Sequence, residues 1–197
     1  MIIQLCGLSG AGKTTLAKAV EKELTIQQFS VEVLDGDDYR KTLCSELGFT
    51  KKDRLENLRR IAFVAGRLSK HGIVAIICAI NPYEEMRQEI RKTYPNVKTV
   101  YVDCSLETLT SRDTKGLYKK ALLPQGHPEK LNNLTGVNDP FEAPLYPDLH
   151  INTEQQNLIE CTQKMVQFIL NSFVSPVKNL KPVSVLNPNS ARQIVDR

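Results

Sequence analysis

The sequence contains no tryptophan and only three histidines, and it lacks the patterns that mark several large classes of protein. No stretch approaches the roughly 18 consecutive apolar residues of a membrane-spanning helix. The histidines, His71, His127 and His150, are scattered and suggest no catalytic relay. The first apolar residues lead directly into the phosphate-binding motif described below, so they do not predict a removable signal peptide. We expect a cytoplasmic protein with no membrane partner.

The cysteines show no metal-binding or redox spacing. None of the five cysteines forms a CxxC pair, and three of them lie in or beside apolar segments typical of strands. This distribution favours buried, reduced thiols over a metal cluster or a disulfide framework. The five are Cys6, Cys44, Cys78, Cys104 and Cys161.

The positive charge is not distributed like a nucleic-acid-binding surface. Residues 175–197 carry four basic residues against Asp196, which accounts for most of the net charge of +4. The other basic residues suit phosphate binding at one site, so we expect no nucleic-acid partner. We assign residues 1–174 to one domain and 175–197 to a basic tail containing three prolines. The pattern leaves open whether this tail is disordered or lies on its own or another subunit.

Residues 7–14, GLSGAGKT, match the phosphate-binding pattern G-x-x-x-x-G-K-[ST] at every fixed position. Glycines leave the backbone N–H groups free to wrap a phosphate, and the dipole of the following helix favours the same anion. Lys13 is expected to reach the β- and γ-phosphates of ATP, and the Thr14 hydroxyl to bind Mg²⁺. The nucleotide-binding residues predicted from this loop are Gly7, Leu8, Ser9, Gly10, Ala11, Gly12, Lys13, Thr14 and Thr15.

Apolar, β-branched segments alternate with helical patterns along the chain. Short apolar runs of this kind are typical of strands covered on both faces, and the alternation predicts a parallel sheet. The sequence therefore predicts one α/β domain with a parallel five-stranded sheet flanked by helices. The expected strands are Ile2–Cys6, Val31–Asp35, Ile73–Ala79, Lys98–Asp103 and Leu149–Asn152, and the expected helices are 13–28, 52–71, 83–93, 105–112 and 154–173.

Residues 113–147 interrupt this alternation. The segment holds three glycines and five prolines among basic and polar residues. So long a connection in a compact domain is usually functional, and we expect a lid over the active site.

The phosphate-binding loop alone leaves motors, switches, transporter ATPases and small-molecule kinases open, but the acidic residues narrow the choice. The third expected strand lacks the terminal Asp that many such ATPases use for Mg²⁺, whereas the second ends in Leu34-Asp-Gly-Asp-Asp38. Asp37 is our candidate for orienting or deprotonating an acceptor hydroxyl, with a share in binding Mg²⁺. The alternative is that Asp37 and Asp38 are a helix N-cap pair.

From residue 1 to about 173 the sequence resembles the adenylyl-sulfate kinase (APS kinase) family. The Asp-Gly-Asp block and the block at 112–121 are far more specific than the phosphate-binding loop, and all blocks occur in the family's order. They are GLSGAGKTT, LDGDDYR (34–40), LGF (47–49), DRLENLRR (53–60), INPY (80–83), RDTKGLYKKA (112–121), LTGVNDPFEAP (134–144) and NTE (152–154).

The resemblance implies a P-loop kinase fold and an ATP- and Mg²⁺-dependent enzyme that commonly forms homodimers. The implied reaction is phosphorylation of the 3′-hydroxyl of adenosine 5′-phosphosulfate (APS), which gives 3′-phosphoadenosine 5′-phosphosulfate (PAPS) and ADP.

The resemblance also implies roles for residues outside the phosphate-binding loop. Arg40, Arg54 and Asn57 would hold the phosphosulfate and ribose, since guanidinium groups match tetrahedral oxyanions. The spacing of Arg54 and Asn57 places them on one helix face. At least one of Arg59 and Arg60, which follow Asn57, is expected to be an ordinary solvated or ion-paired helix residue.

Further residues are implied on the acceptor side and in the lid. Phe49 would lie against the adenine, although it is alternatively a core residue. Ile80 and Asn81 would form the floor beside the acceptor. The lid would contribute Arg112 and Lys115, and Lys115 could offset charge in the transition state.

Three departures from the family pattern fall on the acceptor side or the lid. Leu134 stands where the family usually has a second aromatic ring against the adenine, and Asn81 stands where it has Ser. The connection 122–133 is several residues longer than usual. These changes leave open an alternative acceptor, such as a nucleoside diphosphoramidate in a capsule pathway, and a remote alternative is a non-catalytic nucleotide-binding module.

Overall fold

The computed structural model describes residues 1–174, so the predicted tail at 175–197 lies outside the described residues. Five strands form one sheet in the order β2-β3-β1-β4-β5, and every neighbouring pair is parallel. The predicted parallel sheet is thus confirmed, and the order places the phosphate-binding loop after the central strand. The strands are β1 (Ile2–Cys6), β2 (Val31–Asp35), β3 (Val74–Cys78), β4 (Val97–Asp103) and β5 (Leu149–Asn152).

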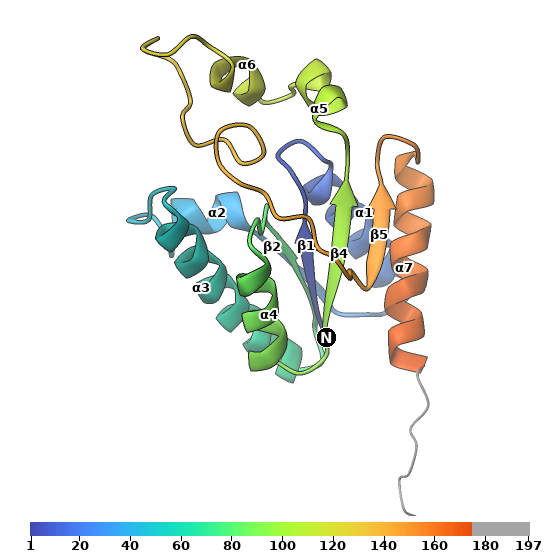
Figure 1. Ribbon diagram of the computed structural model, residues 1–197. Helices are drawn as coiled ribbons and strands as arrows, with labels where there is room; N and C mark the ends of the chain where they lie inside the picture. The colour runs from blue at the N-terminus through green and yellow to red at the C-terminus, as the bar shows by residue number, and fades with distance from the viewer. Residues whose placement is uncertain (175–197) are drawn as a thin grey trace, which may run out of the picture.

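Helices cover both faces of the sheet (Figure 1). One face packs against α3 and α4, and the other against α1 and α7. Alternate side chains of β1 and β3 enter opposite cores, as the two-residue period of a strand requires: Ile3 and Ile76 face one core, whereas Ile2 and Ile77 face the other. The helices are α1 (Lys13–Ile26), α2 (Gly36–Lys41), α3 (Lys51–Lys70), α4 (Glu84–Thr93), α5 (Leu106–Arg112), α6 (Leu117–Ala121) and α7 (Leu158–Val174).

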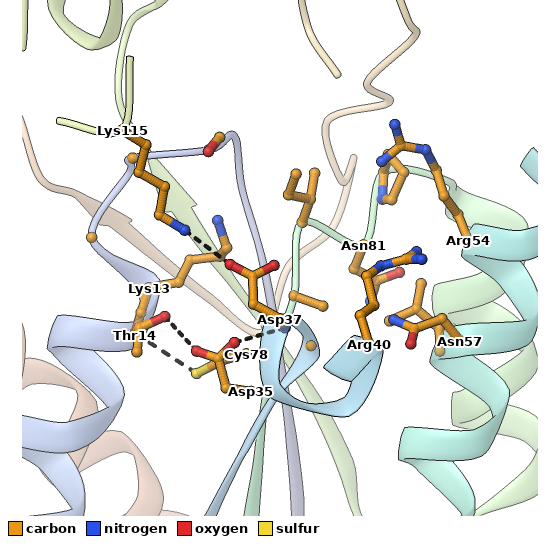
Figure 2. Close-up of a pocket in the computed structure, with 18 of the residues that line it drawn as sticks. Lys13, Thr14, Asp35, Asp37, Arg40, Arg54, Asn57, Cys78, Asn81 and Lys115 are labelled. Atoms are coloured by element: carbon orange, nitrogen blue, oxygen red, sulfur yellow. Dashed lines mark hydrogen bonds and ion pairs between the residues drawn. The ribbon is translucent and has the colours of Figure 1, made fainter. Parts of the chain in front are cut away.

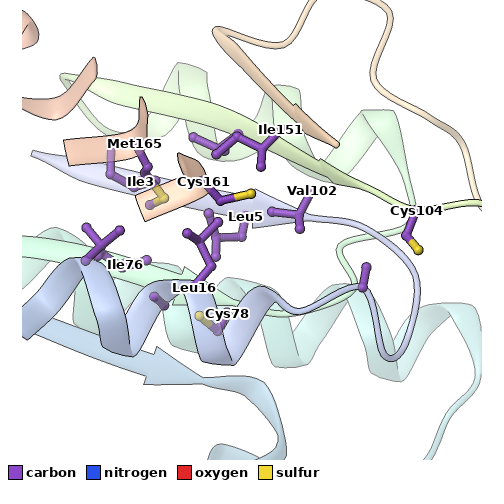
Figure 3. Close-up of a cluster of buried hydrophobic side chains, with 14 of the residues drawn as sticks. Ile3, Leu5, Leu16, Ile76, Cys78, Val102, Cys104, Ile151, Cys161 and Met165 are labelled. Carbon is purple, nitrogen blue, oxygen red and sulfur yellow. The ribbon is translucent and has the colours of Figure 1, made fainter. Parts of the chain in front are cut away.

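The larger core contains cysteines as packing residues (Figure 3). All five cysteines are free and buried, which confirms the prediction of buried thiols. Burial raises the pKa of Cys6 and of Cys78 to about 12. Thiols with so high a pKa remain protonated at neutral pH and are poor nucleophiles.

Two short helices were not predicted, and the last helix begins later than expected. The Asp35 side chain accepts a hydrogen bond from the backbone N–H of Asp37 at 2.9 Å and caps α2. The Asp113 carboxylate likewise accepts from Tyr118 N and Lys119 N at the start of α6. The Asn152 side chain accepts from two following N–H groups and holds residues 153–156 in turns, so α7 begins at Leu158 rather than at 154.

The first part of the 113–147 segment, including α6, lies beyond the carboxyl ends of the strands, and its last residues run back along the sheet to the start of β5 (Figure 1). The buried Tyr118 hydroxyl donates to the carbonyl of Ser9 at 2.8 Å, which joins α6 to the phosphate-binding loop. Ligands of open α/β sheets bind outside the carboxyl ends of the strands, and this arrangement encloses that region.

Within residues 1–174, none of the helices combines the length and hydropathy needed to cross a membrane.

Candidate active site

A cavity of about 310 Å³ opens at the carboxyl edge of β1, β2 and β3. Its walls come from the phosphate-binding loop, α2, α3, the residues after β3, and the segment that links α5 to α6 (Figure 2). The predicted site residues that line it are Ser9, Gly10, Gly12, Lys13, Thr14, Thr15, Asp37, Arg40, Phe49, Arg54, Asn57, Ile80, Asn81 and Lys115.

The phosphate-binding loop curls around the amino group of Lys13. Lys13 Nζ donates to the carbonyl oxygens of Gly7 and Leu8 at 2.9 and 2.7 Å. Burial lowers the pKa of Lys13 to about 8, and the nearby Lys115 also lowers it. A Cβ on Gly7 would lie 2.2 Å from the carbonyl oxygen of Val102, so only glycine fits where the loop leaves β1. This tight approach holds the lysine at the carboxyl edge of the central strand.

Other predicted nucleotide-binding residues lie beside this cavity. Ala11 is buried at the base of the loop. Arg112 lines a small adjoining cavity together with Ser9, Gly10 and Lys115. Arg112 therefore lies beside the phosphate-binding loop, as expected, but outside the main cavity.

The carboxylate next to the Thr14 hydroxyl is that of Asp35, which was not among the predicted site residues. Thr14 Oγ1 donates to Asp35 Oδ2 at 2.8 Å, while Asp35 Oδ1 caps α2 (Figure 2). The alternative that Asp37 and Asp38 form the helix cap is wrong, because Asp35 fills that position. In the strand order β2-β3-β1, β2 is only one strand away from β1, so the carboxyl end of β2 lies close to the loop that follows β1. The signal in the sequence was the position of Asp35 as the last residue of a predicted strand.

Asp37 turns away from Thr14 and towards the 113–147 segment. Its Oδ2 atom lies 2.9 Å from Lys115 Nζ. Two residues predicted to be catalytic are therefore in direct contact, on the opposite side of the cavity mouth from α3 (Figure 2). In this arrangement the Asp37 carboxylate contacts the ammonium group, and its share in binding Mg²⁺ stays a prediction.

Two arginines flank the Phe49 ring. The guanidinium carbons of Arg40 and Arg54 lie 4.6 and 5.6 Å from the ring centroid. Phe49 is 53% exposed, so it is not a core residue. Partial burial, and next the positive charge of Arg54, lower the pKa of the Arg40 guanidinium. Two neighbouring cations and an exposed ring are suited to a ligand that carries both an anionic group and an aromatic base.

Arg54 and Asn57 share the pocket face of α3, as their spacing predicted. Both are buried, at 8% and 4% exposure. Arg54 Nη2 donates to the carbonyl of Asn133 at 2.7 Å and lies 3.1 Å from Asp139 Oδ2, which joins α3 to the 113–147 segment. Asn57 Oδ1 is buried without a hydrogen-bond partner among the described residues. An unpaired buried acceptor that lines a cavity is available to a ligand.

Ile80 and Asn81 form the floor next to the phosphate-binding loop. The Ile80 carbonyl accepts from Gly7 N at 3.1 Å. Asn81 is 1% exposed, has a φ of 47°, and its Oδ1 is another buried acceptor without a partner in residues 1–174. Both residues line the cavity at the positions expected.

Leu134, which was predicted to face the acceptor base, does not line the cavity in this structure. Leu134 is 4% exposed and belongs to the larger core instead of the cavity lining. An aliphatic side chain is stabilised by that burial, at roughly 25 cal/mol per Å² of apolar surface. The two arginines that follow Asn57 are ordinary ion-paired helix residues: Arg59 pairs with Glu89, and Arg60 pairs with Glu56.

Comparison with known proteins identifies the family. The family model described as adenylylsulphate kinase matches residues 1–152. The chain is 50% identical over 154 residues to an adenylyl-sulfate kinase of Deinococcus deserti, covering 78% of this chain and 82% of that protein. It is 43% identical over 166 residues to one from Chloroflexus aurantiacus, covering 84% and 87%. The solved APS kinase of Mycobacterium tuberculosis, in complex with AMPPNP and APS, has a TM-score of 0.80 and 34% identity, covering 86% of this chain and 96% of that chain. The chain therefore belongs to the adenylyl-sulfate kinase family.

Proposed function

We propose that this chain transfers the γ-phosphoryl group of ATP to the 3′-hydroxyl of APS, giving PAPS and ADP. The observation that carries the proposal is one cavity lined by the phosphate-binding lysine, an acidic residue at its mouth, and two arginines beside an exposed aromatic ring. Of the three departures from the family pattern, only Asn81 lines this cavity. The arrangement therefore gives no support to a different acceptor.

The nucleotide end is formed by the loop and the start of α1. Backbone N–H groups of the loop and the N-terminal dipole of α1 attract phosphates. Lys13 would exchange its two loop carbonyls for phosphate oxygens, which carry full negative charge. Arg112, beside Ser9 and Gly10, adds a further cation at this end.

The residues near Thr14 fit Mg²⁺. A hydroxyl and a carboxylate are hard oxygen donors, and Mg²⁺ in kinases takes one or two protein ligands together with waters and substrate phosphates. This is consistent with residues 1–174, which contain no cluster of three or more metal-binding side chains. We assign Thr14 and Asp35 to the ion, with Asp37 nearby. The ion would neutralise charge on the transferring phosphate.

Asp37 and Lys115 are assigned to the chemical step. The 3′-oxygen forms a bond to the γ-phosphorus as the bond to ADP breaks, and Asp37 accepts the hydroxyl proton. Lys115 holds the Asp37 carboxylate and can turn towards the negative charge on the phosphoryl group.

The acceptor is held on the α2 and α3 side of the cavity. Arg40 and Arg54 would bind the phosphosulfate, and Phe49 would stack on the adenine. With Leu134 in the core, Phe49 is the aromatic residue at this wall of the cavity within the described chain. Asn57 would accept a hydrogen bond from the nucleoside through its unpaired oxygen.

We also propose that the 113–147 segment is a lid that moves with substrate binding. At the cavity mouth the segment is held by the exposed ion pair of Lys115 with Asp37, which can open. Tyr118, Ala121 and Leu134 anchor the segment in the larger core. The homodimer and the cytoplasmic location remain predictions, and light scattering of the purified protein tests the first. A related APS kinase from Thiobacillus denitrificans, with 30% identity and covering 86% of this chain and 28% of that chain, is described as hexameric.

The proposed function is tested by measuring ADP release from Mg-ATP with APS as the acceptor, with the nucleotide products identified by mass. Turnover at micromolar APS with formation of PAPS supports it. Weak turnover of APS beside strong turnover of another nucleoside 5′-diphosphate-type acceptor would keep the kinase chemistry and reject the substrate.

A further inference from the structure

Gln4 is a fully buried amide in the middle of the central strand. The other residues of β1 are apolar, and Gln4 has no solvent exposure. Its side chain makes three hydrogen bonds: Nε2 donates to the Arg87 carbonyl at 3.2 Å and to Thr99 Oγ1 at 2.9 Å, and Oε1 accepts from Asn81 Nδ2 at 3.1 Å. A buried polar side chain without hydrogen-bond partners costs folding free energy, whereas both the nitrogen and the oxygen of the Gln4 amide have partners.

These bonds determine the orientation of the Asn81 amide. A backbone carbonyl can only accept, so the nitrogen of Gln4 must face Arg87. The oxygen of Gln4 then faces Asn81 and requires a donor, which only Nδ2 can supply. The Oδ1 atom of Asn81 is left without a partner in residues 1–174, in a side chain that lines the cavity.

The backbone of Asn81 is held from a second side. Its φ of 47° lies in the left-handed region, which costs free energy for a residue other than glycine. The buried Arg87 guanidinium donates to the Asn81 carbonyl at 2.7 Å and to the Glu142 carbonyl at 2.6 Å. The conformation of Asn81 is therefore set by two buried side chains, Gln4 and Arg87, that do not line the cavity.

The position of Asn81 indicates which part of an acceptor it meets. Its neighbour Ile80 is hydrogen-bonded to Gly7 of the phosphate-binding loop. On the other side, the backbone after β3 packs against Gly36 of α2, where an added Cβ would lie 3.3 Å from Ala79 Cβ. The residues after β3 thus lie between the loop that holds the transferring phosphate and the helix that carries Asp37. A ribose must enter this space for its hydroxyl to be phosphorylated.

We propose that Gln4 is a positioning residue that directs the Asn81 oxygen to accept a hydrogen bond from the 2′-hydroxyl of the acceptor ribose. The inference rests on the proposed function, in which the 3′-hydroxyl is the nucleophile and the 2′-hydroxyl is the neighbouring free donor. A site built to hydrogen-bond a hydroxyl discriminates strongly against an analogue that lacks it. Gln4 and Asn81 would therefore set the affinity for the acceptor and leave ATP unaffected.

The test compares KM for APS, 2′-deoxy-APS and ATP in four forms of the full chain. Gln4→Met keeps the volume and removes the acceptor for Asn81 Nδ2. Thr99→Val is the matched control, because it breaks another buried hydrogen bond of Gln4 without touching Asn81. Asn81→Gly tolerates the left-handed backbone and removes the amide.

We expect Gln4→Met and Asn81→Gly each to raise KM for APS by about tenfold, with KM for ATP unchanged and Thr99→Val near wild type. The wild type should show a similar rise with 2′-deoxy-APS, and the two variants should show little additional rise with that analogue. Equal changes in KM for APS and KM for ATP would overturn the inference. It would also be overturned if 2′-deoxy-APS raised KM as much in the two variants as in the wild type.

If Gln4→Met fails to fold, Asn81→Gly with the two acceptors still decides the question. Wild-type turnover of APS is a separate readout: if it fails, the proposed function fails, whereas normal turnover without the analogue effect rejects only the role of Gln4 and Asn81.

Discussion

The Lys115 ammonium lies 2.9 Å from the Asp37 carboxylate, although 78 residues separate them in the chain. The pair closes one side of the cavity mouth and joins α2 to the segment between α5 and α6. Both side chains are more than half exposed, at 57% and 70%. An ion pair this exposed contributes little to folding stability, so its arrangement points to the reaction rather than to the fold.

Asp37→Asn should lower kcat by about 100-fold or more and leave ATP binding nearly unchanged, because the amide cannot accept the hydroxyl proton. Steady-state kinetics and ATP titration measure the two effects. Asp38→Asn is the matched control, since Asp38 is exposed and pairs with Lys41. A change confined to ATP affinity would assign Asp37 to nucleotide binding instead.

Lys115→Met should lower kcat by about tenfold or more, while the melting temperature stays within a degree or two of wild type. Lys119→Met, an exposed change on α6, serves as the control and should leave both quantities unchanged. A large fall in the melting temperature of Lys115→Met would mean that the pair supports the fold.

Lys13→Ala should abolish turnover, because it removes the cation from the transferring phosphates. The lowered pKa of Lys13, about 8, adds a pH dependence. Only the protonated amine attracts phosphate, so ATP affinity should be full below pH 8 and decline as the pH rises through it. Above pH 8, binding should then take up a proton. Calorimetry in buffers of different ionisation enthalpy detects that proton, and Lys13→Met should remove both the uptake and the decline.

Asp35→Asn should raise the Mg²⁺ concentration needed for half-maximal rate by about tenfold, because it replaces the carboxylate beside the Thr14 hydroxyl with a neutral amide. Asparagine is also a good N-cap, so α2 should persist and the melting temperature should change little. Circular dichroism checks the fold. An unchanged Mg²⁺ dependence would contradict the assignment of Asp35 to the ion.

Leu134→Phe tests the position of that side chain in the larger core. If the residue lined the acceptor pocket, an added ring would lower KM for APS. Because Leu134 is buried in the larger core, we expect a loss of about 1–3 kcal/mol in the free energy of unfolding from overpacking, with no gain in acceptor affinity. Chemical denaturation and KM for APS distinguish the two cases.

The sequence by itself determined the sheet, the phosphate-binding loop and the Asp-Gly-Asp block at the end of β2. Local patterns were sufficient for these features, because a strand, a helix or a glycine-rich turn depends on neighbouring residues. The two short helices were missed because six and five residues are too few to show a helical period.

Only the tertiary structure decided which of two similar side chains meets a given partner. Asp35 rather than Asp37 contacts Thr14, because the strand order and the turn into α2 point the two carboxylates in different directions. Leu134 enters the core, and Gln4 hydrogen-bonds the floor residue Asn81, 77 residues further along the chain. Such contacts depend on the packing of elements far apart in the sequence, so no local pattern encodes them.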